Sequence, residues 1–185
     1  MIKILSFILF SPHLFLFLAA SNKEAIVADL YSRSDHKRTE GLLMLSDLSE
    51  RLFRDRYFRT LFYFRTSGIF SKFLRVFYPR EKFFIIDVNT KLGKGVQLAH
   101  PYSTILNAEI IGENVYINHL VTVGEKNGKR PIIGNNVQLH AGAIVIGDIK
   151  IGDDVIVGAG TVVTKDVPSS AVVVGNPARI LSRNV

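Results

Sequence analysis

Two histidines in the second half of the chain, His100 and His119, are the residues best suited to chemistry. An imidazole with its ordinary pKa of about 6.5 can accept a proton near neutral pH, so histidine is the usual general base for a hydroxyl group. The chain has no cysteine, which excludes a thiolate nucleophile, a thiolate metal site and a disulfide. These residues could therefore carry out proton transfer by imidazole. Whether they can do so depends on how the chain positions the two side chains.

The elements that position them are repeats of six residues. Between residues 133 and 165 an aliphatic residue returns at every sixth position, usually followed by a glycine or another small or polar residue. This period fits neither a helix nor the alternation of a single strand, and it predicts an all-β parallel β-helix of stacked short strands and turns. The aliphatic positions are Ile133, Leu139, Val145, Ile151, Val157 and Val163.

The repeat can be followed back from residue 133 to Leu92. One residue is inserted before Ile105, which the count assigns to the core. A polar loop adds four residues between Val123 and Ile133. Strand-like residues begin near residue 83, so we expect a β-helix domain over 83–185.

Counting hexads also predicts which residues stack. Three hexads make one coil, so Leu98 and Ile117 open equivalent hexads in neighbouring coils. Coils stack about 4.8 Å apart, so we expect His100 and His119 to lie one above the other at one corner. His140 falls one position earlier and points elsewhere. The third positions of the four equivalent hexads are His100, His119, Ala141 and Ala159.

Residues 21–82 predict a small α-helical region. Ser21 and Glu24 have the spacing of a capping box, which starts a helix that runs to about Tyr31. Residues 32–40 are polar and predict a loop. One or two helices are expected from residue 41 to 65, with one apolar face. That face contains Leu42, Leu45, Leu48, Leu52 and Phe53.

Residues 1–20 are apolar, with a polar interruption at Ser11, Pro12 and His13. Four interpretations are open: a signal peptide, a membrane-spanning helix, an anchor lying in one leaflet, and a buried helix of a helical cap. Pro12 breaks the middle of a span, and a polar group at mid-depth is costly. We therefore favour the anchor.

A basic and aromatic window follows in residues 51–84. The window holds nine basic residues and only two acidic ones, Asp55 and Glu81. Twelve aromatic residues are interleaved with the basic ones. This composition is typical of nucleic-acid binding, of an anionic membrane surface, or of helices whose aromatics pack on a core. No RNA-binding signature is present, so we expect no nucleic-acid partner, and both the membrane surface and the core-packed helices stay open.

Four segments make the chain similar to the hexapeptide-repeat acyltransferases with a left-handed β-helix. Within them it most resembles the branch of serine acetyltransferases and of colanic-acid and capsular-polysaccharide acetyltransferases. The resemblance covers about half of the chain, and residues before the β-helix match no family securely. The segments are Gly93–His100, Val121–Gly124, Val157–Pro168 and Gly175–Arg179.

This resemblance implies acetyl-CoA as the donor, no metal, and a homotrimer with active sites between subunits. It implies that His100 is the general base. His119 matches a histidine of the polysaccharide-modifying members and would orient His100, contact the acceptor or act as the base itself. The positions that match the CoA-binding surface are Ala141, Ala159, Thr164, Lys165 and Arg179.

Three positions depart from the serine acetyltransferase pattern. Ala99 replaces an aspartate beside the base, Ile85 replaces another, and Arg130 replaces a histidine that helps to hold serine. We therefore expect a sugar hydroxyl as acceptor, in surface-polysaccharide biosynthesis. A lipid-linked sugar and a cytoplasmic, peripheral location at the inner face of the cell membrane would suit the apolar and basic segments.

Three alternatives remain at this point. The first is serine O-acetyltransferase of cysteine biosynthesis. The second is a zinc hydratase of the carbonic-anhydrase type, which would need His100, His119 and His140 as three imidazole ligands. The third is a non-catalytic assembly module.

Overall fold

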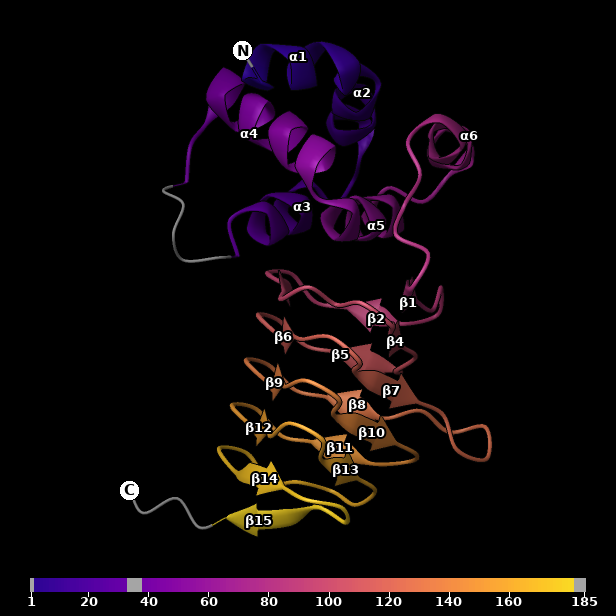
Figure 1. The fold of residues 1–185 in the computed structure, drawn as a ribbon, viewed down its shortest axis with the longest axis vertical. Helices are drawn as coiled ribbons and strands as arrows, with labels where there is room; N and C mark the ends of the chain where they lie inside the picture. Colours follow the sequence, from indigo (N-terminus) through magenta and orange to yellow (C-terminus); the bar gives the residue numbers. More distant parts are fainter. Residues whose placement is uncertain (1, 33–37, 182–185) are drawn as a thin grey trace. The chain divides into compact units, whose positions relative to one another are not determined.

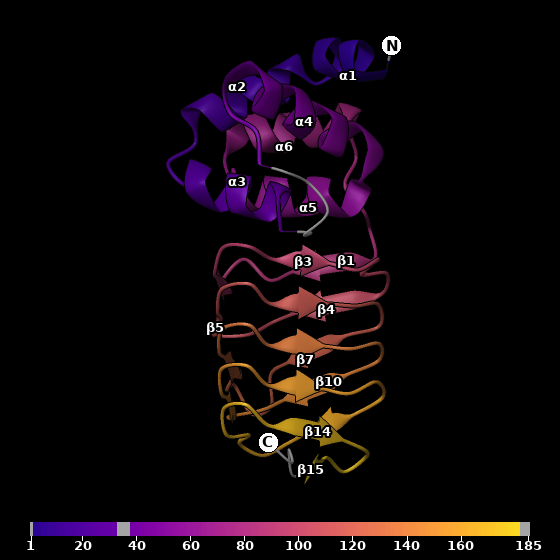
Figure 2. The same cartoon turned by 90° about the vertical axis from the view of Figure 1, so that its left-hand side faces the viewer.

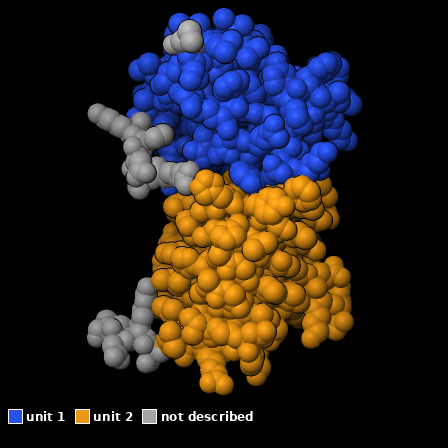
Figure 3. All heavy atoms as spheres, viewed as in Figure 1, with its two compact units in different colours: residues 1–82 blue, residues 83–185 orange. Residues whose placement is uncertain are grey.

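The computed structural model describes residues 2–32 and 38–181. The chain divides into two compact units, Met1–Lys82 and Phe83–Val185 (Figure 3). The division falls where strand residues begin in the sequence. Each unit has its own hydrogen bonds and core and is described by itself.

The second unit is a β-helix whose short strands form three sheets, stacked coil upon coil (Figures 1 and 2). All pairs are parallel except the last, in which β15 runs antiparallel to β14. The predicted left-handed parallel β-helix is therefore confirmed. The first sheet contains β1 (Phe84–Ile86), β4 (Thr104–Leu106), β7 (Thr122–Gly124), β10 (Ile144–Ile146) and β13 (Val162–Val163). The second contains β2 (Lys91–Leu92), β5 (Ile110–Ile111), β8 (Ile132–Ile133) and β11 (Lys150–Ile151). The third contains β3 (Gln97–Leu98), β6 (Tyr116–Ile117), β9 (Gln138–Leu139), β12 (Ile156–Val157), β14 (Val172–Val174) and β15 (Arg179–Leu181).

The aliphatic positions of the repeat form the core of the β-helix, as predicted. Ile133, Leu139 and Val145 are each at most 1% exposed. The assignment of Ile105 to the core is wrong, because Ile105 is 42% exposed and Leu106 is fully buried. Strand β4 pairs Leu106 with Val123, so the turn between β3 and β4 holds two extra residues instead of one.

A row of glycines lets the coils approach closely after the strands of the second sheet. Gly112 stacks on Gly134, and Gly134 stacks on Gly152 in the next coil. A methyl group built on Gly112 would lie 2.5 Å from the carbonyl oxygen of Gly134. The backbone cannot yield there without breaking coil-to-coil hydrogen bonds, so the absence of a side chain is a steric requirement.

We predict that Gly112→Ala lowers the free energy of unfolding of the β-helix by about 1–3 kcal/mol, the usual range for overpacking. The control is Gly124→Ala, where the nearest atom to the added methyl group would be 3.7 Å away on Ile146. Urea unfolding followed by circular dichroism measures both. Equal stability of the two variants would contradict the steric requirement.

The first unit is a bundle of six helices in the described residues. Its core is built from residues of α2 to α6 and from Phe10, with Phe7 of α1 packed against it, and it is rich in aromatic rings, including Phe58, Phe62 and Tyr63. The helices are α1 (Ile2–Leu9), α2 (Ser11–Ala19), α3 (Lys23–Leu30), α4 (Gly41–Arg54), α5 (Arg56–Arg65) and α6 (Ile69–Phe77).

Two details of this unit differ from the sequence prediction. The N-cap of α3 is Asn22 instead of Ser21, and no side-chain cap bond forms, because the Asn22 amide donates to the carbonyl of Arg65. Leu42 is 71% exposed, whereas Leu48 and Leu52 are fully buried, so the apolar face of α4 is shorter than predicted. Part of the predicted loop at 32–40 lies outside the described residues.

The apolar N-terminal segment forms α1 and α2, which meet at an angle of 62°. In the described residues no single helix is long and apolar enough to cross a membrane. The bent pair of α1 and α2 together has the necessary length and apolar composition. Phe10, Leu14 and Phe17 are buried in the core of the helical unit. One side of the segment is therefore packed within the protein.

His13 lies fully buried in this core. Its Nε2 is 2.7 Å from the hydroxyl of Tyr63, which in turn donates to the carbonyl of Tyr78. Because that hydroxyl has already given its hydrogen, Nε2–H of His13 is the donor. Burial, with a smaller contribution from the cation of Arg59, lowers the pKa of His13 to about 4.

This pKa predicts a loss of stability in acid. The unfolded chain takes up a proton on His13 near the ordinary pKa of 6.5, whereas the folded chain does so only near 4. Stability therefore falls as the pH falls through this window, by about 2 kcal/mol between pH 7 and pH 5. His13→Gln, which keeps a donor for Tyr63 and does not titrate, should remove that part of the slope.

The measurement is urea unfolding of the full chain at the two pH values. His119→Gln is the control, because His119 is exposed. A wild-type pH slope equal to that of His13→Gln would show that His13 is not held neutral in the folded protein.

Candidate active site

The candidate site lies at the corner that joins the third sheet to the first. His119 follows β6, Ala141 follows β9 and Ala159 follows β12. The amide of Gly142 donates to the carbonyl of His119 at 3.0 Å, and the amide of Gly160 donates to Ala141 at 2.8 Å. These three corner positions stack in consecutive coils, as the hexad count predicts.

His100 belongs to the same corner but not to the same stacked row. The pairing of Leu98 with Ile117 places both histidines two residues beyond paired strand positions. The two extra residues then widen the turn of the first coil. As a result, the amide of Leu120 donates to the carbonyl of Tyr102 at 2.8 Å, so Tyr102 takes the place next to His119 in the ladder. The prediction that His100 stacks directly on His119 is therefore wrong in this detail: Tyr102 stacks on His119, and His100 lies in the same turn outside the stacked row.

The backbone around both histidines is in an uncommon conformation. His100 has φ 52°, and Leu120, directly after His119, has φ 59°. In the next coils the position of Leu120 is held by Gly142 and Gly160, with φ 70° and 66°. The left-handed region costs a side-chain-bearing residue about 1–2 kcal/mol, which glycine avoids. The coils that carry the histidines thus hold local strain that the neighbouring coils relieve with glycine.

Asn118 fixes the ring of His119. Its Oδ1 accepts the backbone N–H of His119 at 2.8 Å and lies 2.7 Å from Nδ1 of the same histidine. A backbone N–H can only donate, so this atom of Asn118 is an acceptor and Nδ1 carries the ring proton. In the neutral ring the lone pair is then on Nε2, where a base needs it. Asn118 in turn donates to the Tyr116 hydroxyl at 3.4 Å.

Sequence reasoning missed Asn118. Its signal was a side-chain amide directly before a corner histidine, which can reach the backbone N–H of its neighbour. In the part of the chain that the structure describes, no hydrogen bond to the ring of His100 is found. Both rings are exposed.

His140 is separate from these two histidines. It is half-buried, and its ring packs 5.7 Å from the ring of Tyr116. Over residues 2–32 and 38–181 there is no group of three His, Cys, Asp or Glu side chains that could hold a metal ion. The three imidazoles that a zinc centre would need are not gathered at one place.

The positions predicted for the donor fall into two groups. Ala141 and Ala159 continue the corner row beyond His119, and Arg179 begins β15 beside it. The turn before Arg179 lies over the start of β13, because the backbone of Val162 bonds to both Gly175 and Ala178 at 3.0 Å. Thr164 and Lys165 are exposed and follow the other end of β13.

The corner therefore offers an oriented imidazole at one end and small side chains along the coils at the other. Small residues leave the coil edge open to a long, narrow ligand, and Arg179 can pair with a phosphate. An alcohol that approaches Nε2 of His119 or the ring of His100 would lie beside such a ligand.

Known proteins share this repeat and this fold. Residues 130–165 match the family model described as bacterial transferase hexapeptide (six repeats). Serine acetyltransferase of Synechococcus elongatus is 40% identical over 104 residues, which are 54% of this chain and 43% of that protein. The putative colanic acid biosynthesis acetyltransferase WcaB of Escherichia coli K12 is 38% identical over 99 residues, 51% of this chain and 61% of WcaB. The chain thus spans about half the length of these relatives.

A solved structure extends the similarity beyond the β-helix. Soybean serine acetyltransferase in its apo form matches with a TM-score of 0.66 and 31% identity, over 86% of this chain and 68% of that chain. Because unit 2 is only residues 83–185, the match includes part of the helical unit. The similarity in fold therefore reaches residues before the β-helix, where the sequence alone matches no family securely.

The chain belongs to the hexapeptide-repeat acyltransferases, in the branch that includes serine acetyltransferases and colanic acid acetyltransferases. The predicted family and the fold class are both confirmed. The part played by each site residue stays a prediction.

We predict that Asn118 acts through His119. Asn118→Ala and His119→Ala should each lower kcat/KM for acetyl transfer by about 10–100-fold, the usual effect of misplacing a reacting group by about 1 Å. The double variant should be no worse than either single variant, because the pair works as one unit. Asn118→Asp keeps the acceptor oxygen and should retain most of the rate.

Thiol release from acetyl-CoA measures all four variants. Additive losses in the double variant, or equal losses in Asn118→Asp and Asn118→Ala, would contradict the positioning role.

Proposed function

We propose that this chain is an acetyl-CoA-dependent O-acetyltransferase. The observation that carries the proposal is the exposed corner at which His119, held by Asn118 through Nδ1, joins a row of small residues. Relatives that match about half of this chain are named as acetyltransferases, which supports the same reaction.

The proposed reaction is direct transfer. An imidazole nitrogen takes the proton of the acceptor hydroxyl as its oxygen attacks the thioester carbonyl carbon. The C–S bond breaks, the imidazolium returns the proton to the sulfur, and the products are an acetyl ester and free CoA thiol. The chain has no cysteine, so a cysteine acyl-enzyme is excluded.

We assign the base to His100, the position that the resemblance gives it, and acceptor orientation to His119. The row of Ala141 and Ala159 is assigned to the pantetheine arm, and Arg179, Thr164 and Lys165 to the far end of CoA. We also propose a homotrimer, because the resemblance implies sites completed between subunits.

Serine is the first candidate acceptor. The comparisons with known proteins are richest in serine acetyltransferases, and they favour this alternative over the sugar hydroxyl expected from the sequence.

A sugar hydroxyl is the second candidate acceptor, on a specific observation. Free serine brings an ammonium group, and Ala99 and Ile85 supply no carboxylate for it where the family pattern has aspartates. Arg130, at the third altered position, lies 3.7 Å from Asp87 and is occupied by that ion pair. The similarity to WcaB agrees with such an acceptor.

The test is thiol release from acetyl-CoA with serine and with a panel of nucleotide-linked and lipid-linked sugars. We expect His100→Ala to lower kcat/KM by about 100–10,000-fold with the true acceptor, the usual contribution of a general base. The control is His140→Ala, which lies outside the corner row.

Turnover with serine alone would establish the first candidate, and turnover with a sugar alone would establish the second. No release with any acceptor would overturn the catalytic proposal in favour of an assembly module, and release that is unchanged in His100→Ala would overturn the assignment of the base to His100.

A further inference from the structure

The helix α6 exposes its apolar side. Five apolar residues of this nine-residue helix are 60–75% exposed: Ile69, Phe70, Phe73, Val76 and Phe77. With 3.6 residues per turn they occupy about a third of the helix circumference, as one stripe. Contiguous apolar surface of this kind usually marks a place where something binds.

The polar side of α6 is held inside the helical unit. The Ser71 hydroxyl donates to the carbonyl of Thr66 and lies 3.1 Å from the Thr66 hydroxyl. Arg75 donates to the carbonyl of Tyr63 at 3.0 Å, and its guanidinium lies over the ring of Tyr63 at 5.2 Å. Rolling α6 to bury the stripe would break these buried contacts, so the apolar side stays outward.

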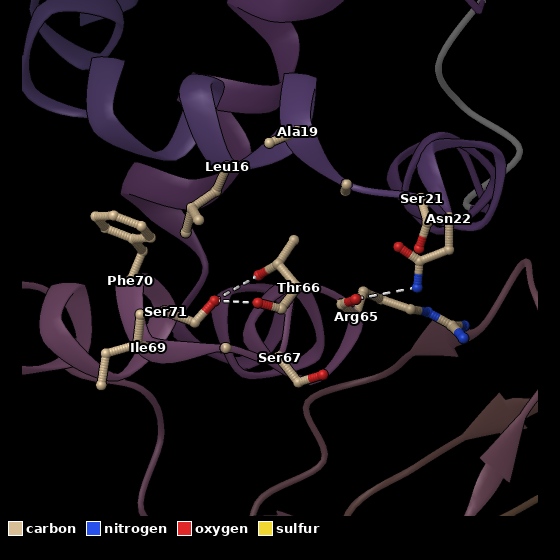
Figure 4. A pocket seen from close by; sticks show the side chains of 12 residues that line it. Leu16, Ala19, Ser21, Asn22, Arg65, Thr66, Ser67, Ile69, Phe70 and Ser71 are labelled. Carbon is tan, nitrogen blue, oxygen red and sulfur yellow. Dashed lines mark hydrogen bonds between the residues drawn. The ribbon is translucent and has the colours of Figure 1, made fainter.

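The stripe of α6 borders a hollow that is shared with α2 and lined by both apolar and polar residues. A hollow of about 310 Å³ lies between the end of α2 and the start of α6. Figure 4 shows Leu16 and Ala19 of α2 on one side of it and Ile69 and Phe70 of α6 on the other. Phe15 and Leu18, also on α2, are exposed.

No acidic residue lies on α6, and the short segment that follows it, residues 80–82, carries two cations and Glu81. Lys72 is exposed on the helix, and Arg80 and Lys82 are exposed just after it. They have no ion-pair partner among the described residues. Arg59 and Arg65, by contrast, are used inside the unit: Arg59 binds carbonyls of the chain, and Arg65 pairs with Asp29 at 2.9 Å.

We propose that the outward stripe of α6, with Lys72, Arg80 and Lys82 beside it, docks this chain on an anionic lipid bilayer. Phenylalanine and aliphatic side chains would enter the headgroup boundary, and the long basic side chains would reach the phosphates. A symmetric contact between two copies fits less well, because it would bring the same three cations together.

The test is flotation of the full-length protein with vesicles of phosphatidylcholine alone and of phosphatidylcholine mixed with phosphatidylglycerol. We expect binding to the mixed vesicles, weakened by salt. Phe73→Ser combined with Phe77→Ser should lower partitioning about tenfold or more. Lys72→Glu should lower it about fivefold and reduce the preference for anionic lipid. Val88→Ser, at an exposed apolar residue of the β-helix, is the control and should bind as the wild type does.

Circular dichroism and light scattering accompany each variant. Absence of binding to any vesicle, or binding unchanged in the double phenylalanine variant, would overturn the proposal. A lower oligomeric mass of that variant, with no vesicle binding by the wild type, would assign the stripe to a protein contact instead. Thiol release with a soluble acceptor should stay unchanged in these variants, so this outcome is separable from the proposed catalysis.

Discussion

The structure of the β-helix depends on one constraint: every coil must follow the path of the coil beside it. The backbone of each strand bonds to the strands before and after it, so a change of direction in one coil has to be matched in the next. The inward aliphatic residues stabilise this stacked arrangement, since burial of each Val, Leu or Ile side chain contributes about 1.5–3 kcal/mol of folding free energy. The row of Gly112, Gly134 and Gly152 permits it, since their neighbours leave no room for a methyl group.

The candidate site lies where neighbouring coils do not follow the same path. The turn that carries His100 has two residues more than the turn that carries His119, so the two histidines share a corner without sharing a ladder position. Leu120 accepts a left-handed backbone that Gly142 and Gly160 adopt in the neighbouring coils. Regular coils hold the corner in place on one side, and the irregular coils present the imidazoles.

This contrast explains which features could be predicted from the sequence. The sixfold period reports the inward residues directly, so the three sheets and the row from His119 to Ala159 follow from it. It fails at Ile105 and Leu106, because both are aliphatic and a shift of one residue turns a strand over. Only the pairing of Leu106 with Val123 decides which of them enters the core. Asn118 could not be found from spacing either, because its role rests on the direction of one side chain.

The helical unit shows the same limit. The window of basic and aromatic residues is uniform in the sequence, yet Phe58 and Phe62 are buried and Phe73 and Phe77 are exposed. What separates them is tertiary: Ser71 and Arg75 find partners inside the unit and so turn the apolar side of α6 outward. Composition alone indicates a surface-seeking segment but does not say which helix carries it.

The choice of acceptor turns on charge at the corner. An imidazolium forms as the hydroxyl proton is taken, and a carboxylate partner would stabilise it more than an amide does. Asn118 supplies only an amide dipole to His119, and Ala99 supplies nothing to His100. An ammonium group that enters such a site loses its hydration and gains no ion pair in exchange. A neutral hydroxyl has a smaller desolvation cost. If serine is nevertheless the acceptor, the charge that matches its ammonium has to come from a residue other than Asn118 and Ala99.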